Sequence, residues 1–410
     1  MTRRMTLAQL LMGAKLASAQ GGTNLQVPEW QKRRTWAEKS QVAVAGQNRF
    51  GLKLARELAA ARPGENIFIS PLSVFLALAM TGNGAAGSTK AAMWHTLGLP
   101  AGLTDSALNE AAQSLTKLLE SEKGVQLAIA NALWASLSFQ FGAEFAKRCD
   151  DVYAAKVTTL DFTRPVATDT INNWVKEKTL GMIPNIVTFD IVKAAAVILT
   201  NAIYFRGKWE DPFPKSQTVT KPFHLDGARS KNVPMMKNSH LTAAYRDGGN
   251  FESAELAYEH SGVRMQVLLP KPGRTAKAVL EKLDWDALRK LPASADLDLS
   301  LPRFTMTFDE KLGKTLKKMG MEIAFKYPGA DFTPMGSKLF YIGEVLHKTR
   351  LEVDEEGTVA AAATAVIMMP GAGAPVKREK KTLVFDRPFV VLMYENTTGS
   401  LLFAGLVQEP

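Results

Sequence analysis

The sequence predicts an α+β protein built as one large domain. Apolar residues recur at helical spacing through the first third of the chain, whereas segments typical of strands follow Gly124. The 410 residues are enough for one large domain or two ordinary ones, but residues 45–350 contain no linker-like composition and no internal repeat. We therefore expect a single domain over residues 42–410, preceded by an N-terminal extension over residues 20–41.

Helical spacing of apolar residues predicts helices over residues 42–61, 74–80, 105–121 and 308–320. Pro63 and Gly64 end the first of them, because neither residue continues a helix well. Thr104 or Asp105 provides the N-cap of the third. The polar residues 21–41 are expected to form a loosely ordered lead-in to the first helix.

Strand patterns dominate the later part of the chain. Apolar side chains occupy every second position of residues 125–129, and residues 195–205 are almost continuously apolar, as expected for a strand buried on both faces. Leu297, Leu299 and Leu301 alternate with polar residues, which predicts a sheet with one face toward solvent. Residues 389–407 predict a hairpin with its turn at residues 395–399.

Composition and charge limit the classes of partner. The net charge is +10, which favours an anionic partner such as an acidic polysaccharide. The cations are scattered without an interleaved aromatic array, so nucleic-acid binding is not expected. No apolar run is long enough to predict a membrane-spanning helix. Cys149 is the single cysteine, which excludes an internal disulfide and a thiolate metal site.

Catalytic and metal-binding motifs are missing from the sequence. The five histidines lie far apart, and neither a zinc-binding H-E-x-x-H nor a G-x-S-x-G nucleophile elbow occurs. Residues 82–87 match a dinucleotide-binding fingerprint, but they follow a predicted helix rather than a strand, so the phosphate geometry would fail. We therefore expect no enzymatic activity, no cofactor and no metal.

The first 19 residues resemble a signal peptide. Arg3 and Arg4 precede a moderately apolar stretch, and Ala17-Ser18-Ala19 has the pattern of a cleavage site before Gln20. Because Gln9 and Lys15 interrupt the stretch, a helical or disordered extension is the alternative. The pattern favours a secreted or periplasmic protein over a cytoplasmic one.

One stretch, about residues 355–381, is unusual for a folded domain. Its first part is rich in alanine, and residues 370–375 are proline, glycine and alanine. Small side chains let a segment slide between two existing strands without large pockets, so the stretch could be exposed in one state and a strand in another. An exposed loop with no switching role fits the composition equally well.

Several further segments of the chain match the sequence pattern of one known family. Residues 385–393 are similar to the C-terminal signature of the family, and residues 403–410 are similar to its usual ending. Further segments that resemble serpins are residues 66–73, 200–209, 301–304, 320–321 and 331–332. The similarity extends over residues 42–410 in the order of the family.

The resemblance implies a serpin fold of three β-sheets with many helices and an exposed reactive loop. It implies a monomer of the inhibitory, bacterial type whose partner is a serine protease, and cysteine proteases are further candidates. The protease attacks the loop, and at the acyl-enzyme stage the cleaved loop inserts into the central sheet and distorts the protease. The alternative is a non-inhibitory member that acts as a binding or carrier protein or as a chaperone.

The family pattern assigns roles to named residues. Gly357 is similar to the hinge glycine and Thr358 to the first residue that enters the sheet, and Val359 departs from the acid that is usual there. The implied hinge comprises Glu356, Gly357, Thr358, Ala360, Ala361, Ala362, Ala363 and Thr364. The implied shutter and breach, the polar residues beneath and at the top of the central sheet, comprise Ser70, Ser73, Asn201, His347 and Trp209.

The family spacing places the reactive bond between Gly371 and Ala372. Small residues there suit elastase-like or subtilisin-like proteases. Met368 and Met369 are alternatives that suit a chymotrypsin-like pocket, although Pro370 is unfavourable after a cleaved bond. Cleavage farther along, before residues 377 or 378, would need a longer inserted arm than the family uses.

Overall fold

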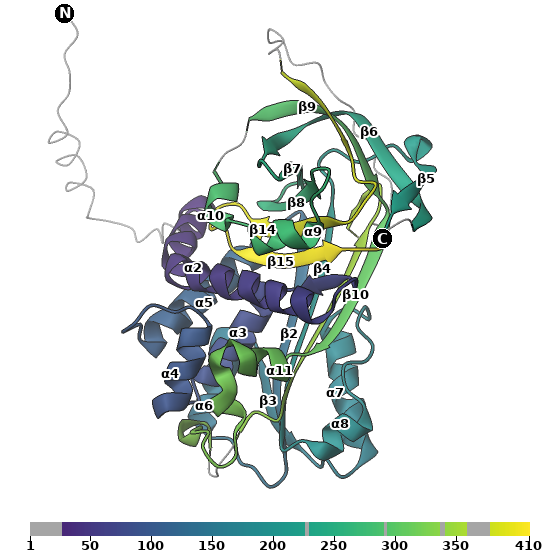
Figure 1. The fold of residues 1–410 in the computed structure, drawn as a ribbon. Helices are drawn as coiled ribbons and strands as arrows, with labels where there is room; N and C mark the ends of the chain where they lie inside the picture. The colour runs from purple at the N-terminus through teal and green to yellow at the C-terminus, as the bar shows by residue number, and fades with distance from the viewer. Residues whose placement is uncertain (1–26, 226–228, 291–292, 337–340, 359–377) are drawn as a thin grey trace, which may run out of the picture.

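The computed structural model describes residues 27–225, 229–290, 293–336, 341–358 and 378–410, and the structural statements that follow concern these residues (Figure 1). The predicted α+β class is confirmed, because helices dominate the first part of the chain and two large sheets hold the strands. In the part of the chain that the structure describes, no helix combines the length and apolar character needed to cross a membrane.

The α-helices cover both faces of one sheet and part of the other. Their bounds are α2 Glu29–Ala61, α3 Pro71–Gly82, α4 Gly87–Thr96, α5 Asp105–Glu120, α6 Ala143–Tyr153, α7 Pro165–Lys178, α8 Phe189–Ala194, α9 Ala276–Glu281, α10 Trp285–Leu288 and α11 Gly313–Leu316. As predicted, α2 ends just before Pro63, and the Thr104 side chain caps α5 by accepting the N–H of Ala107.

The six-stranded sheet has the strand order β10-β11-β12-β4-β2-β3, with a further pairing of β11 to β4. Its strands are β2 Val125–Ser136, β3 Lys156–Leu160, β4 Val197–Lys208, β10 Phe304–Lys311, β11 Glu344–Val353 and β12 Gly357–Thr358. Alternate residues of β2 and β4 belong to two different apolar clusters: Leu133 packs in the main core, and Trp134 packs with α7. The sheet is therefore buried on both faces, as the apolar run at residues 195–205 predicts.

The nine-stranded sheet has the order β1-β15-β14-β8-β7-β6-β9-β13, with β5 paired to β6. Its strands are β1 Ile67–Ile69, β5 Val219–His224, β6 Ser230–Asp247, β7 Phe251–Ala257, β8 Val263–Pro270, β9 Ser294–Pro302, β13 Lys380–Val384, β14 Phe389–Glu395 and β15 Leu401–Val407. The C-terminal hairpin is confirmed in β14 and β15.

The described strands form two sheets where the serpin resemblance implies three. The reason is β6, which is 18 residues long and pairs with β5 near its start and with β7 over its last four residues. A register shift between Asn238 and Leu241 bends the pairing of β6 with β9. The hydrogen-bonded path therefore runs through β6 without a break, and two of the implied sheets are joined.

Two predictions about individual elements are wrong. The first helix begins at Glu29, not at residue 42, so much of the expected loosely ordered lead-in is helical. Its charged turns contact α5 through the ion pair of Lys39 with Glu110, and Arg33 pairs with Glu122 just after α5. The helix predicted over residues 308–320 begins only at Gly313, because Phe304, Met306 and Phe308 alternate with exposed residues in strand β10.

Candidate functional site

Strands β4 and β11 are parallel neighbours along a stretch that we call the seam. The register pairs of the seam run from Ile198 with Glu344 to Tyr204 with Arg350. Beyond Arg350 the two strands no longer face each other, because β12 lies between them. β12 thus separates β4 from β11 at one end of the sheet, which we call the hinge end. Along the seam the two strands remain paired with each other.

Gly357 is the first residue of the intervening strand. It lies opposite Lys208 of β4, and its φ of +154° falls where L side chains rarely occur. A Cβ atom built on Gly357 would come within 2.2 Å of the carbonyl oxygen of Gly207. Both the backbone angle and the close approach to β4 therefore require glycine at this position.

Thr358 continues β12 and is fully buried. It lies opposite Gly207 of β4 and Val353 of β11. Its hydroxyl lies 2.7 Å from the hydroxyl of Tyr258, whose ring stacks on Trp209 with a centroid distance of 4.6 Å. Burial raises the pKa of Tyr258 well above its usual value, so the phenol stays protonated. The side chain of Thr358 is thus fully buried against an uncharged phenol.

A tight turn leads from β11 into β12. The carboxylate of Asp354 accepts the backbone N–H groups of Glu356 at 2.9 Å and Gly357 at 3.1 Å. The indole N–H of Trp209 donates to the carbonyl of Asp354 at 3.0 Å, and its backbone N–H donates to the carbonyl of Glu356. Burial raises the pKa of Asp354, although the two amide donors oppose this shift. Trp209 therefore ties the turn to the end of β4.

Charged side chains flank the turn. Glu355 is only 2% exposed, and its Oε1 accepts from the hydroxyl of Thr218 at 2.7 Å and from Arg303 at 2.5 Å. Burial alone would raise the pKa of Glu355, but these two donors outweigh burial and lower it. Glu356 forms a second ion pair with Lys215. The hinge end is thus held by charge as well as by backbone pairing.

The predicted shutter residues meet at one level of the seam. Asn131 of β2 lies opposite Asn201 of β4, which lies opposite His347 of β11. The amide N–H₂ of Asn201 donates to the Oδ1 of Asn131 and to the hydroxyl of Ser73, and its Oδ1 lies 2.5 Å from Nδ1 of His347. The hydroxyl of Ser70 caps α3 by accepting the N–H of Ser73. We call this group the shutter cluster.

The hydrogen bonds of His347 fix its protonation. The backbone N–H of Ser70 donates to Nε2 at 3.1 Å, so Nε2 is an acceptor and the proton lies on Nδ1, which donates to Asn201. Burial lowers the pKa of His347 to about 3, so the ring is neutral at physiological pH. The shutter cluster is therefore an uncharged, fully buried hydrogen-bond network.

The structure brings together all the sequence-predicted residues that it describes. Glu356, Gly357, Thr358 and Trp209 lie at the hinge end, and the other four form the shutter cluster. The remaining predicted positions lie outside the described residues: the signal peptide at residues 1–19, Ala360, Ala361, Ala362, Ala363, Thr364, and the reactive-bond candidates Met368, Met369, Gly371 and Ala372.

The sequence analysis did not assign Asn131, Tyr258, Arg303 or Glu355 to the site. Asn131 carries a signal in hindsight, since it is the one polar residue in an otherwise apolar stretch of β2. The role of Arg303 depends on a contact with a residue 52 positions away, which no local pattern reveals.

Comparison with known proteins gives consistent matches over nearly the whole domain. A family model described as Serpin (serine protease inhibitor) matches residues 45–410. The chain is 32% identical to human leukocyte elastase inhibitor over 382 residues, which are 89% of this chain and 99% of that protein.

Solved structures are likewise similar over nearly the whole chain. Human kallistatin superposes with a TM-score of 0.80 at 28% identity, covering 91% of this chain and 99% of that one. Human thyroxine-binding globulin in complex with thyroxine superposes with a TM-score of 0.78 at 28% identity, covering 92% and 99%.

Proposed function

The chain belongs to the serpin family, and from this premise we propose that it is a suicide-substrate inhibitor of serine proteases, and of some cysteine proteases, that traps the acyl-enzyme by inserting its cleaved loop into the seam. The observation that carries the proposal is β12. Its two residues already occupy the first positions of a strand between β4 and β11. The alanine-rich residues 360–363 follow directly in the sequence.

Hydrogen bonding supplies a driving force for insertion. β4 and β11 pair in parallel along the seam, whereas β12 is antiparallel to both. If β12 lengthens along the seam, one parallel ladder is replaced by two antiparallel ladders, which hold more backbone hydrogen bonds and pair slightly better per residue. The additional hydrogen bonds and the better antiparallel pairing cannot form while β4 and β11 remain paired with each other.

The register of β12 indicates where each loop residue would lie after insertion. Continued antiparallel pairing would place Thr364 between Asn201 and His347, on the same face of the sheet as Thr358. The hydroxyl of Thr364 could then replace the contact that these two side chains lose. Val359 would point to the opposite face of the sheet, so its departure from the usual acid should do little harm to insertion.

The same register supports a reactive bond close to residue 371. Continued pairing would place Ile367 between Ile198 and Glu344, the first register pair of the seam. We propose that cleavage occurs between Gly371 and Ala372, with Met368 and Met369 as alternatives. Small residues at this bond suit an elastase-like or subtilisin-like target, and the similarity to human leukocyte elastase inhibitor supports the same choice.

Incubation with a protease panel tests the proposal. Elastase-, subtilisin- and chymotrypsin-like enzymes are each mixed with the full chain and separated by denaturing gel electrophoresis. We expect a covalent complex with at least one enzyme. Mass spectrometry should show that the released C-terminal peptide begins at Ala372. Cleavage of the chain with full retention of protease activity in every case would contradict the proposal.

The second candidate is a non-inhibitory serpin that acts as a carrier or chaperone. It is motivated by the similarity to thyroxine-binding globulin, which was solved in complex with thyroxine. Here the loop would not insert, so limited proteolysis of the loop would leave the melting temperature unchanged. Insertion would instead raise the melting temperature, because it completes the sheet.

The remaining partner assignments stay predictions. The monomeric state and export through residues 1–19 rest on sequence alone, and an anionic polysaccharide partner rests on the net charge of +10.

A further inference from the structure

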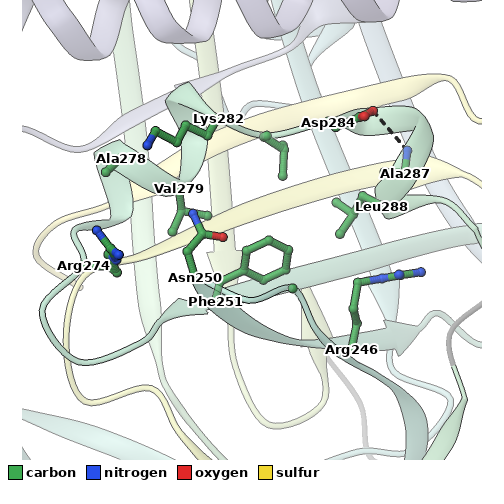
Figure 2. A pocket seen from close by; sticks show the side chains of 12 residues that line it. Arg246, Asn250, Phe251, Arg274, Ala278, Val279, Lys282, Asp284, Ala287 and Leu288 are labelled. Atoms are coloured by element: carbon green, nitrogen blue, oxygen red, sulfur yellow. Dashed lines mark hydrogen bonds between the residues drawn. The ribbon is translucent and has the colours of Figure 1, made fainter.

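A pocket of about 490 Å³ lies between the turn that joins β6 to β7 and the helices α9 and α10 (Figure 2). It has the size of a small-molecule site. None of the residues that line it belongs to the hinge end, the seam or the shutter cluster. The proposed inhibitory mechanism therefore gives this pocket no role.

The floor of the pocket is apolar. Phe251, Val279, Leu283 and Leu288 line it, and each is less than 9% exposed. In Figure 2 the ring of Phe251 lies between the strands below and the helices above. These side chains are packed into the core from one side, so the floor is preformed and offers a surface for an apolar ring or chain.

The polar lining of the pocket is mainly cationic. Arg246, Arg274 and Lys282 line it, and none of them has an ion-pair partner among the described residues. By contrast, Lys271 nearby is paired with Asp247. Among the described residues of the lining, Asp284 is the only carboxylate, and it accepts the N–H of Ala287 as the N-cap of α10. Three cations thus face one carboxylate that is already engaged.

The cations are arranged at two ends of the apolar floor. Figure 2 shows Arg274, Lys282 and the amide of Asn250 toward one end and Arg246 toward the other, with Phe251 between them. One guanidinium N–H₂ of Arg246 donates to the carbonyl of Lys290, while its Nε is buried without a hydrogen-bond partner.

We propose that this pocket binds an amphipathic organic anion, a small molecule with an apolar ring or chain and one carboxylate or sulfonate group. The apolar body would lie on Phe251 and Leu288, and the acid would pair with Arg274 and Lys282. A sulfated sugar matches the cations but has no apolar body for the floor, so the lining favours the small amphipathic anion.

Titration with 1-anilinonaphthalene-8-sulfonate, a fluorescent aromatic sulfonate, tests the assignment on the full chain. We expect saturable binding of one molecule per chain. The uncharged analogue N-phenyl-1-naphthylamine should bind at least about tenfold more weakly, since a hydrogen bond to a charged group contributes about 1.5–3 kcal/mol. Equal affinity of the two probes, or no saturable binding of the sulfonate, would overturn the proposal.

Substitutions locate the probe. Arg274→Gln combined with Lys282→Gln should raise the dissociation constant about tenfold or more, and Lys277→Gln, on α9 but outside the lining, should leave it unchanged. Ala278→Trp and Ala287→Trp, made separately, fill the pocket from α9 and from α10, so one of them suffices if the other fails to fold. Unchanged affinity in a folded filling variant, or full displacement of the probe by sucrose octasulfate, would contradict the assignment.

Discussion

The two ends of the contact between β4 and β11 are held in different ways. At the hinge end, the turn before β12 is fastened by the ion pairs of Glu355 with Arg303 and of Glu356 with Lys215, and Arg303 is 49% exposed. At the shutter cluster, Asn201 and His347 are fully buried and uncharged. Solvent and salt therefore act directly on the first end and hardly at all on the second.

This difference suggests separate roles for the two regions. Ion pairs with one solvent-exposed partner weaken with salt, whereas a buried network is lost as a unit when one member is removed. We infer that the hinge end sets how readily insertion begins and that the shutter cluster sets the resistance to its progress. The following predictions test this division, from the largest expected effect to the smallest.

Replacement of Thr358 should have the largest effect. Thr358→Arg places a charge at a fully buried position beside Tyr258, so β12 should be expelled and insertion blocked. We expect loss of the covalent complex on denaturing gels and conversion of the inhibitor into a substrate. Val359→Arg is the matched control, because residue 359 would face the other side of the sheet, and it should still inhibit. Equal behaviour of the two variants would refute the role of Thr358.

Asn201→Ala should be the most damaging change in the shutter cluster. It removes the partners of Ser73, Asn131 and His347 in a buried site, where each unsatisfied group costs about 1–3 kcal/mol. We expect an apparent destabilisation of about 3 kcal/mol in urea unfolding and faster spontaneous loss of inhibitory activity. Asn232→Ala, on the exposed part of β6, should have no measurable effect.

The shutter cluster should also give the protein a pH dependence. Burial lowers the pKa of His347 from its ordinary 6.5 to about 3, so between these values the unfolded chain takes up a proton that the folded chain does not. Stability is therefore complete above about pH 6.5 and falls as the pH drops, by at most about 1.4 kcal/mol per pH unit. Between pH 7 and pH 5 we expect a loss of about 2 kcal/mol.

His347→Gln isolates this contribution. The variant should be less stable at pH 7, but the difference between pH 7 and pH 5 should largely disappear from its urea unfolding curves. An unchanged pH dependence in His347→Gln would show that other groups produce it.

The smallest effects are expected at the hinge end, and they should be unequal. Arg303→Gln leaves the buried Glu355 without its charged partner and should cost about 1 kcal/mol. Glu355→Gln leaves only the half-exposed Arg303 unpaired, which should cost less than about 0.5 kcal/mol. Urea midpoints at low and high salt measure both, and the Arg303 effect should shrink with salt. Equal costs would mean that the burial of Glu355 does not matter.

Local sequence patterns predicted those helices and strands whose apolar spacing matches the burial seen in the structure. The cap at Thr104 and the C-terminal hairpin follow from neighbouring residues, and the structure has both. The sequence pattern did not predict that α2 begins at Glu29, because the first turns of this helix are largely polar. Lys39 and Arg33 hold these turns to residues of distant segments through ion pairs. The alternation at Phe304, Met306 and Phe308 was missed because a helical pattern follows directly.

The candidate site divides in the same way. The resemblance to the family predicts hinge roles for Gly357 and Thr358, and the positive φ of Gly357 gives a physical reason for a glycine there. Asn131, Tyr258 and Arg303 act through partners that only the sheet register brings near, so no local pattern could have identified them. The proposed insertion would require a second arrangement of the same sequence, in which residues after Thr358 pair with β4 and β11.

The two strands that flank residues 359–377 lie in different sheets. β12 belongs to the six-stranded sheet, and β13 is paired with β9 in the other. While the intervening chain is whole, β12 can lengthen only as far as its tether to β13 allows. A single cut removes that tether at once. In the proposed mechanism the protein therefore responds to a covalent event, the breaking of one peptide bond, and merely touching the loop does not release it.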